Sequence, residues 1–120
     1  MNFTSQICTT KEQSEKLLAL GLKKETADCV VSSIGSKDRL IHTEEPIYVM
    51  ESLSSKRIPN YPAWSLHRLL CLIPKEYRYD IDASQLFVNA MICSDPYTET
   101  IELIRLLLED GYIYDEYLNA

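Results

Sequence analysis

Glycine is scarce in this chain, with only 3 among 120 residues. A loop that wraps around phosphate groups needs several glycines, so a nucleotide-binding loop of that kind is not expected. The motifs G-x-S-x-G, G-x-G-x-x-G, G-x-x-x-x-G-K-[ST] and H-E-x-x-H are all missing. No apolar run approaches the roughly 18 residues of a membrane-spanning helix. The first ten residues also lack the basic and apolar parts of a secretion signal. We therefore predict neither membrane association nor secretion.

Residues that carry metal or nucleophilic chemistry are also few. The chain has 4 cysteines and 2 histidines, and no two cysteines stand at C-x-x-C spacing. Without a secretion signal, we expect free thiols in the cytoplasm. His67 and Cys71 lie four apart on a predicted helix and could share one face. Because cysteine–histidine sites normally need a fuller set of ligands, we predict no metal, no cofactor and no catalytic residue.

Charge is the feature that is present and unevenly distributed. The hydrophobic content of 46% and charged content of 25% are ordinary for one globular domain, here predicted to span residues 1–120. Residues 1–94 hold 11 acids and 11 bases, whereas residues 95–120 hold 7 acids and only Arg105, which accounts for the whole net charge of −6. An acidic C-terminal end disfavours binding to a phosphate backbone and favours a basic protein partner.

Two helices have strong sequence signals at both ends. Thr10 and Gln13 form a capping-box pattern at the start of a helix predicted from Lys11 to Leu20. Asp95 is a good N-cap for a second, strongly apolar helix, with Pro96 in its first position. Both segments are followed by a glycine that suits a helix end, Gly21 and Gly111.

The segment around the single tryptophan also predicts a helix. Ser65 is its N-cap, Pro74 ends it, and Trp64 is spaced to pack on Leu69 as a hydrophobic staple. The apolar residues follow one helix face at positions i, i+3, i+4 and i+7: Leu66, Leu69, Leu70 and Ile73.

Residues 25–63 give weaker signals. Spacing of one helix face at Ala27, Val30, Val31 and Ile34 predicts another helix from Glu25 to Ile34. Ile47–Met50 and Leu40–His42 are predicted as short strands, and Glu51–Tyr61 as a loop.

A β-hairpin is predicted over residues 77–93. Tyr77, Tyr79 and Ile81 alternate with polar residues, as in a half-buried strand, and Gln85–Cys93 is its partner. Together these elements predict an α+β fold, with about four helices packed on a small antiparallel sheet that contains the hairpin.

Two stretches taken together resemble a known group of proteins. They are Thr9–Leu18 with Gly21–Leu22 and Glu25–Asp28, and Pro62–Leu66 with Leu69–Leu70 and Pro74. Over nearly the whole chain, this pattern resembles a family of small proteins encoded by gut anaerobes of the Bacteroides type and by their phages and mobile elements. The resemblance implies a phage or mobile-element context, and it implies no reaction and no site residues.

The preferred hypothesis is a non-enzymatic cytoplasmic protein that binds another protein. Exposed aromatic residues often mark contacts, and the acidic end of the chain is rich in tyrosine. The candidate interaction residues are Trp64, Tyr112, Tyr114, Asp115, Glu116 and Tyr117. The same end could instead be a terminal segment that docks on the domain through its aromatic side chains.

Two other functional classes stay open. The localised acidity would suit a phage-encoded inhibitor that mimics nucleic acid, although binding to nucleic acid itself is not expected. An enzyme could be built from residues scattered in the sequence, of which four are the least implausible participants: His67, Cys71, Asp80 and Asp82.

Overall fold

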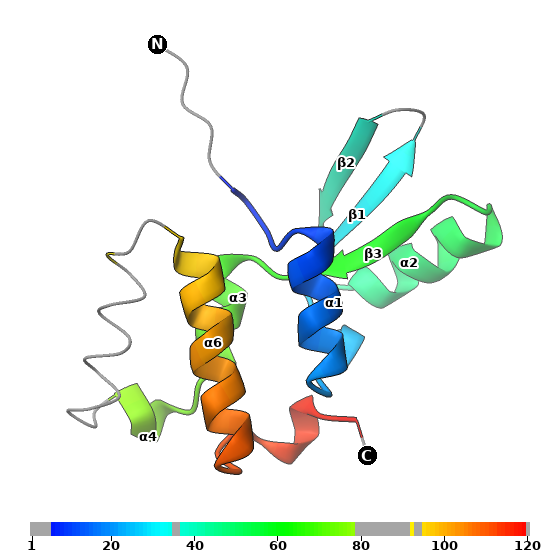
Figure 1. Ribbon diagram of the computed structural model, residues 1–120. Helices are drawn as coiled ribbons and strands as arrows, with labels where there is room; N and C mark the ends of the chain where they lie inside the picture. The colour runs from blue at the N-terminus through cyan, green and yellow to red at the C-terminus, as the bar shows by residue number, and fades with distance from the viewer. Residues whose placement is uncertain (1–5, 35–36, 79–91, 93–94, 120) are drawn as a thin grey trace.

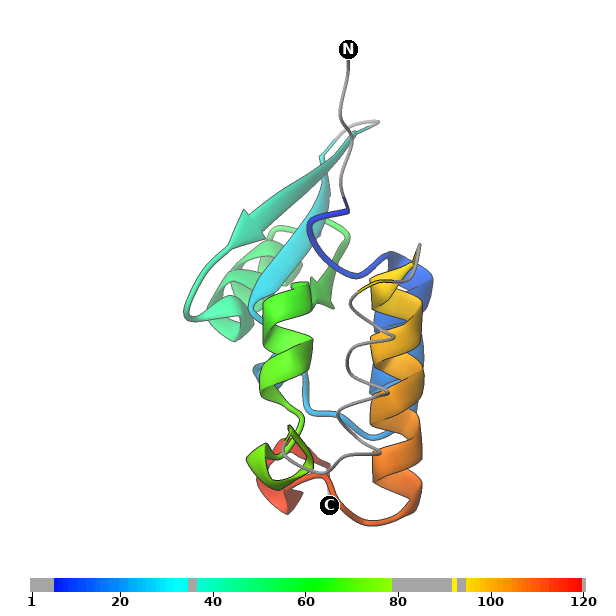
Figure 2. The ribbon, with the colours of Figure 1, turned by 90° about the vertical axis from the view of Figure 1, so that its left-hand side faces the viewer.

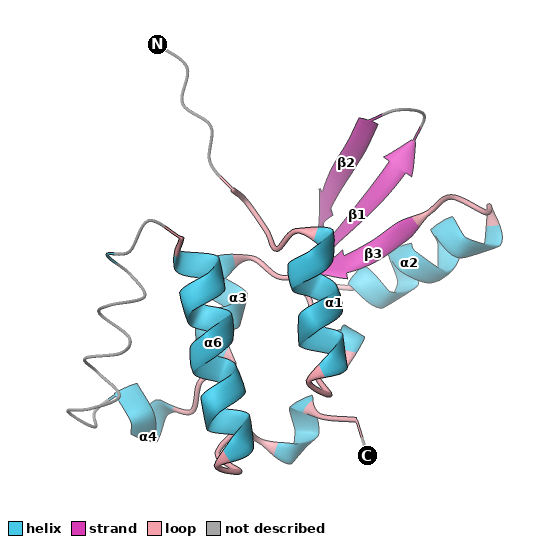
Figure 3. Cartoon of the chain, in the orientation of Figure 1, coloured by secondary structure: helices cyan, strands magenta, loops and turns pink. Residues whose placement is uncertain are grey.

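Most of the protein's helices lie at one end, and its sheet, with one helix packed on it, lies at the other (Figures 1 and 3). The computed structural model describes residues 6–34, 37–78, 92 and 95–119. The elements are α1 (Lys11–Ala19), the 3-10 turn η1 (Lys24–Thr26), β1 (Cys29–Ile34), β2 (Lys37–His42), α2 (Pro46–Ser55), β3 (Asn60–Ala63), α3 (Leu66–Cys71), α4 (Lys75–Arg78), α6 (Pro96–Glu109) and the 3-10 turn η2 (Asp115–Tyr117). This arrangement confirms the predicted α+β class. Within the described ranges, none of the helices is long and apolar enough to cross a bilayer.

The sheet is antiparallel, with strand order β2-β1-β3. Directly opposite residues of neighbouring strands share a face of the sheet. The register therefore places on one face Cys29, Val31, Leu40, His42, Tyr61 and Ala63. Cys8, from the segment before α1, packs on this face. β2 is one of the two outer strands, and its residues Lys37–Leu40 are exposed.

Two of the weaker predictions are wrong. The segment predicted as a helix from Glu25 to Ile34 holds η1 and β1 instead. Val30 and Val31 are both buried, because α2 packs on β1 and the opposite face carries the cluster around Cys29. Because both faces of β1 are covered, Val30 and Val31 are both apolar, and such a pair also fits the spacing of a helix face. The β-branched side chains of valine favour a strand over a helix.

Residues 46–55 form a helix where a strand and a loop were predicted. The predicted strand Ile47–Met50 lies inside α2, and the predicted loop Glu51–Tyr61 contains the end of α2 and the start of β3. Pro46 occupies the first turn of the helix, where its missing N–H costs nothing. Pro46 and Met50, four residues apart, are buried, and Tyr48 is exposed, as on an amphipathic helix. The predicted strand Leu40–His42 is confirmed as part of β2.

The helical end is built around one apolar core. Helices α3 and α6 lie side by side (Figure 2), and α1 also packs on α6. Trp64 is fully buried in this core with Leu69 of α3 and Ile104 of α6. Its indole Nε1 donates to the Thr26 hydroxyl at 3.0 Å, which satisfies the one polar atom of the ring. The predicted caps are confirmed at Thr10, Ser65 and Asp95.

Three helices end in the same hydrogen-bonded motif. In α1, α2 and α6 an amide two residues beyond the C-cap donates back into the last turn: Leu22 to Leu17, Ile58 to Leu53, and Tyr112 to Leu107. The motif needs a positive φ one residue past the C-cap. Gly21 (φ 105°) and Gly111 (φ 75°) adopt this conformation without strain. Arg57 (φ 59°) adopts it at an energetic cost, because it has a Cβ atom.

The predicted hairpin is only partly within reach of the structure. Tyr77 and Arg78 belong to α4, so the strand predicted to begin at Tyr77 is wrong at these two positions. Residues 79–91 and 93–94 lie outside the described residues. The described hairpin is the one formed by β1 and β2.

Candidate functional sites

The C-terminal segment is docked on the domain through its backbone. Beyond α6, Ile113 is buried in the helical core. The amide of Lys23 donates to the Tyr117 carbonyl at 2.8 Å, and the amide of Asn119 donates to the Gly21 carbonyl at 2.8 Å. The burial of Ile113 therefore fixes the segment before η2, and the two backbone bonds fix the segment at the end of η2.

Two tyrosines of this segment remain exposed. Tyr112 is 47% exposed and Tyr114 is 43% exposed. The Tyr114 hydroxyl donates to Glu76 Oε2 at 3.3 Å, and its ring packs edge-on against Tyr117 with 5.8 Å between centroids. Partial burial, together with the carboxylate of Glu76, raises the pKa of Tyr114, so the phenol remains a donor at neutral pH. We call Tyr112, Tyr114, Asp115, Glu116 and Tyr117 the C-terminal surface.

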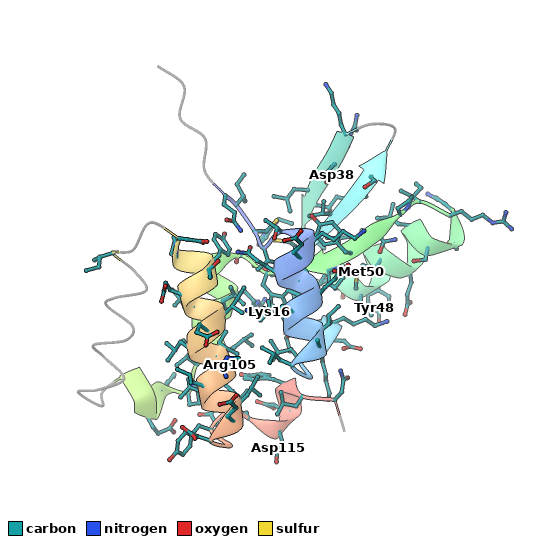
Figure 4. All side chains as sticks on the ribbon, viewed as in Figure 1. Lys16, Asp38, Tyr48, Met50, Arg105 and Asp115 are labelled. Atoms are coloured by element: carbon teal, nitrogen blue, oxygen red, sulfur yellow. The ribbon has the colours of Figure 1, made fainter. Side chains whose placement is uncertain are left out.

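An open cavity of about 440 Å³ lies at the C-terminal surface. Its walls combine aromatic, apolar and acidic groups: Pro74, Glu76, Gly111, Tyr112, Ile113, Tyr114 and Asp115. Asp115 projects from the lower end of the molecule in Figure 4. The predicted interaction residues from this end of the chain therefore lie together.

Trp64, the remaining predicted interaction residue, does not belong to this surface. Its ring is fully buried, and its backbone is hydrogen-bonded to Thr9 through both the amide (3.0 Å) and the carbonyl (2.9 Å). The prediction that Trp64 borders a partner groove is wrong. A tryptophan just before an N-cap can lie in the core or at a protein contact, and Trp64 lies in the core.

The acidic face of α6 is partly neutralised. Arg105 donates to Glu102 and to Glu109, three residues before it and four after it. The hydrogen bond from Arg105 lowers the pKa of the Glu102 carboxyl. Among the described residues, Asp110, Asp115 and Glu116 form no ion pair, so unneutralised charge lies at and beside the C-terminal surface. Asp95 and Glu99, at the start of α6, also form none within the described part of the chain.

The predicted pair on α3 is formed and exposed. Cys71 Sγ lies 3.6 Å from His67 Nε2. Cys71 also borders a second cavity of about 310 Å³, which Lys23, Arg68 and Tyr117 help to line. Across the described ranges, no third metal-ligating side chain joins this pair. Asp80 and Asp82, the other residues of the enzyme alternative, lie outside the described residues.

A cluster that the sequence reasoning missed lies where β1 begins. Asp28, Cys29 and His42 each place a potential ligand atom within 4.8 Å of the others. Cys29 Sγ lies 3.6 Å from Asp28 Oδ1, and His42 Nε2 lies 3.3 Å from Asp28 Oδ2. Asp28 and Cys29 are buried, while the His42 side chain is 69% exposed. We call these three residues the β1 cluster.

Asp28 also joins the sheet to α3. Its carboxylate accepts hydrogen bonds from the Ser65 amide at 2.8 Å and the Ser65 hydroxyl at 2.6 Å. Burial alone would raise the pKa of Asp28. The two bonds from Ser65 and the charge of Arg68 outweigh burial and hold the pKa below its usual value.

Cys8 adds a second thiol beside the β1 cluster. It packs against Cys29, and a hydrogen bond from Cys29 lowers the pKa of the Cys8 thiol. Donating that bond, together with burial and the nearby Asp28 charge, raises the pKa of Cys29. Of the two, Cys8 is therefore the thiol that ionises first.

Sequence reasoning missed the β1 cluster because His42 is distant in the chain from Asp28 and Cys29. Only the register of β1 on β2, which places His42 opposite Cys29, brings them together. Recognising residues 29–42 as a hairpin would have revealed the pair.

Comparisons with protein-family models, curated proteins and solved structures find no match to this chain.

Proposed function

We propose that the protein acts by binding a basic segment of another protein at the C-terminal surface. One observation carries the proposal: the cavity there is walled by two exposed tyrosines and the carboxylates of Glu76 and Asp115. It lies at the end of the chain that holds the entire net charge of −6. Acidic groups beside aromatic rings suit a lysine or arginine side chain of the partner.

The surface is already ordered for such contacts. Tyr114 holds the Glu76 carboxylate by a hydrogen bond, and η2 is fixed by the backbone bonds at Lys23 and Asn119. A preformed surface loses little conformational entropy on binding, which favours affinity. A guanidinium group in the cavity would meet a tyrosine face and a carboxylate at once.

Fluorescence anisotropy with a labelled arginine- and lysine-rich peptide tests this proposal. Tyr114→Ala removes one ring and the hydrogen bond to Glu76, and we expect roughly tenfold weaker binding. Asp115→Asn removes one charge and should weaken binding less. A neutral peptide of equal length should bind far more weakly than the basic one.

Two matched variants control for exposure and charge. Tyr48→Ala removes a tyrosine that is 64% exposed on α2, away from the C-terminal surface (Figure 4). Glu51→Gln removes one exposed carboxylate from the same helix. Both should bind the peptide like the wild type. Equal weakening by Tyr48→Ala and Tyr114→Ala would mean that the contact is non-specific and would refute the proposal.

The ion pairs of α6 favour a protein partner over mimicry of nucleic acid. A mimic needs a row of unneutralised charges, and Arg105 interrupts that row by pairing with Glu102 and Glu109. Competition with DNA for a basic DNA-binding protein distinguishes the two functions. Displacement by duplex DNA but not by the free basic peptide would favour mimicry.

The resemblance noted in the sequence supports a phage or mobile-element setting for this binding. The neighbouring genes are the test of that setting. A replication, structural or host-defence cassette around the gene would support it and would narrow the class of partner, whereas housekeeping genes on both sides would count against it.

A further inference from the structure

We propose that the β1 cluster, together with Cys8, is a binding site for a Zn²⁺ ion. Asp28, Cys29 and His42 offer a carboxylate oxygen, a thiol sulfur and an imidazole nitrogen within 4.8 Å of one another. Cys8 packs against Cys29 but lies outside this close group, so its side chain would have to move inward to supply a fourth ligand. This site lies on the sheet and does not depend on the C-terminal surface.

The spacing is close to that of a tetrahedral site. With metal–ligand bonds of about 2.0–2.3 Å, neighbouring ligand atoms around Zn²⁺ stand about 3.5 Å apart. The Cys29–Asp28 and His42–Asp28 separations are 3.6 Å and 3.3 Å. Binding therefore requires only a short inward movement of the remaining atoms. His42 is free to make it, because its side chain is 69% exposed on an outer strand.

The surroundings hold the Asp28 ligand in place. Ser65 donates to both carboxylate oxygens of Asp28, and each oxygen has a second lone pair for a metal ion. A carboxylate that is oriented by hydrogen bonds in this way is a common support for bound zinc. The Ser65 contacts can remain when the ion binds, so α3 stays anchored.

The donor set selects the metal. Thiol and imidazole ligands suit Zn²⁺, whereas Mg²⁺ and Ca²⁺ prefer oxygen ligands alone. Both thiols must lose their protons when they ligate the ion, so binding releases protons and weakens at low pH.

Titration of the full chain with Zn²⁺ and with Co²⁺ under reducing conditions tests the site. We expect one ion per chain and a thiolate-to-Co²⁺ absorption band. Cys8→Ser should reduce that band, and Cys29→Ser should abolish binding. His42→Ala should lower the affinity for Zn²⁺ by about 100-fold. Because Cys29 is buried and its variant can fail to fold, the exposed His42 provides the decisive substitution.

The second cysteine–histidine pair provides the matched control. His67 and Cys71 are also 3.6 Å apart, but no third ligand joins them in the described part of the chain. His67→Ala and Cys71→Ser should bind Zn²⁺ and Co²⁺ like the wild type. Zn²⁺ should also raise the melting temperature of the wild type and of Cys71→Ser, but not of His42→Ala. Absence of stoichiometric binding, or a Co²⁺ band that survives His42→Ala unchanged and disappears in Cys71→Ser, would overturn the proposal.

Discussion

Different interactions stabilise the helical end and the sheet of this protein. The helical end has an extensive apolar core with Trp64 at its centre, whereas the cluster on one face of the sheet is small and centres on Cys29 and Val31. The sheet is tied to the helices by hydrogen bonds from Ser65 to Asp28 and between Thr9 and Trp64. A buried apolar side chain contributes about 1.5–3 kcal/mol, and a hydrogen bond about 1 kcal/mol net. Most of the stability should therefore reside in the helical end.

Removing the tryptophan should give the largest effect. Trp64→Ala leaves a cavity in the core and removes the hydrogen bond from the indole to the Thr26 hydroxyl, so we expect a loss of about 3–5 kcal/mol in the free energy of unfolding. Urea denaturation followed by far-UV circular dichroism measures it, because the variant has lost the only tryptophan. Val31→Ala in the sheet cluster should cost less, about 1–2 kcal/mol. Equal losses would refute the contrast between the two ends.

Asp28→Ala removes the hydrogen bonds between Asp28 and Ser65, which are one of the links between the sheet and the helical end. It leaves the Ser65 amide without its acceptor, so we expect a loss of about 1–3 kcal/mol at neutral pH. Because the folded pKa of Asp28 is lowered, its contribution is present above the unfolded pKa of about 3.9 and disappears as the pH falls through the folded value. Denaturation of the wild type and the variant at neutral and acidic pH should show the difference shrinking. A difference that stays constant down to pH values well below 3 would contradict this account.

Substitutions at the ends of α2 and α6 should change the free energy of unfolding in opposite directions. Arg57→Gly at the end of α2, which packs on the sheet, relieves a positive φ of 59° and should stabilise the protein by about 0.5–1 kcal/mol. Gly111→Ala at the end of α6 introduces that same strain and should destabilise it by about 1 kcal/mol. Thermal melts of the two variants measure both signs. Destabilisation by Arg57→Gly would mean that its side chain makes a contribution that outweighs the strain.

The smallest effect should come from the surface of the stable helical end. Arg105→Ala removes two partly exposed ion pairs on α6, and we expect the loss in the free energy of unfolding to be the smallest of this series. That loss should shrink further in high salt, because salt screens exposed charges. Chemical denaturation at low and high ionic strength measures both values. A loss comparable to that of Trp64→Ala would show that charge, not apolar burial, stabilises α6.

The same division explains which elements the sequence could predict. Helices α1, α3 and α6 could be predicted because each has capping residues and an apolar stripe within its own sequence segment. The strands of the sheet depend on partners far away in the chain. Val30 and Val31 become a strand because β3 pairs with β1 and the sheet is covered on both faces, which a local window does not contain.

The candidate sites follow a similar rule. The C-terminal surface could be anticipated because its charges and tyrosines are neighbours in the sequence. The β1 cluster could not, since it depends on the pairing of β1 with β2 and on the position of Cys8 beside them. Trp64 was misjudged because a large aromatic residue serves cores and interfaces equally well.

The exposed outer strand of the sheet bears on how the protein behaves at high concentration. A free strand edge can recruit the edge of another molecule and begin aggregation. In β2 the consecutive charged residues Lys37, Asp38 and Arg39 are exposed, and charges at such an edge disfavour a second strand of the same kind. We expect these three side chains to disfavour self-association through the edge of β2.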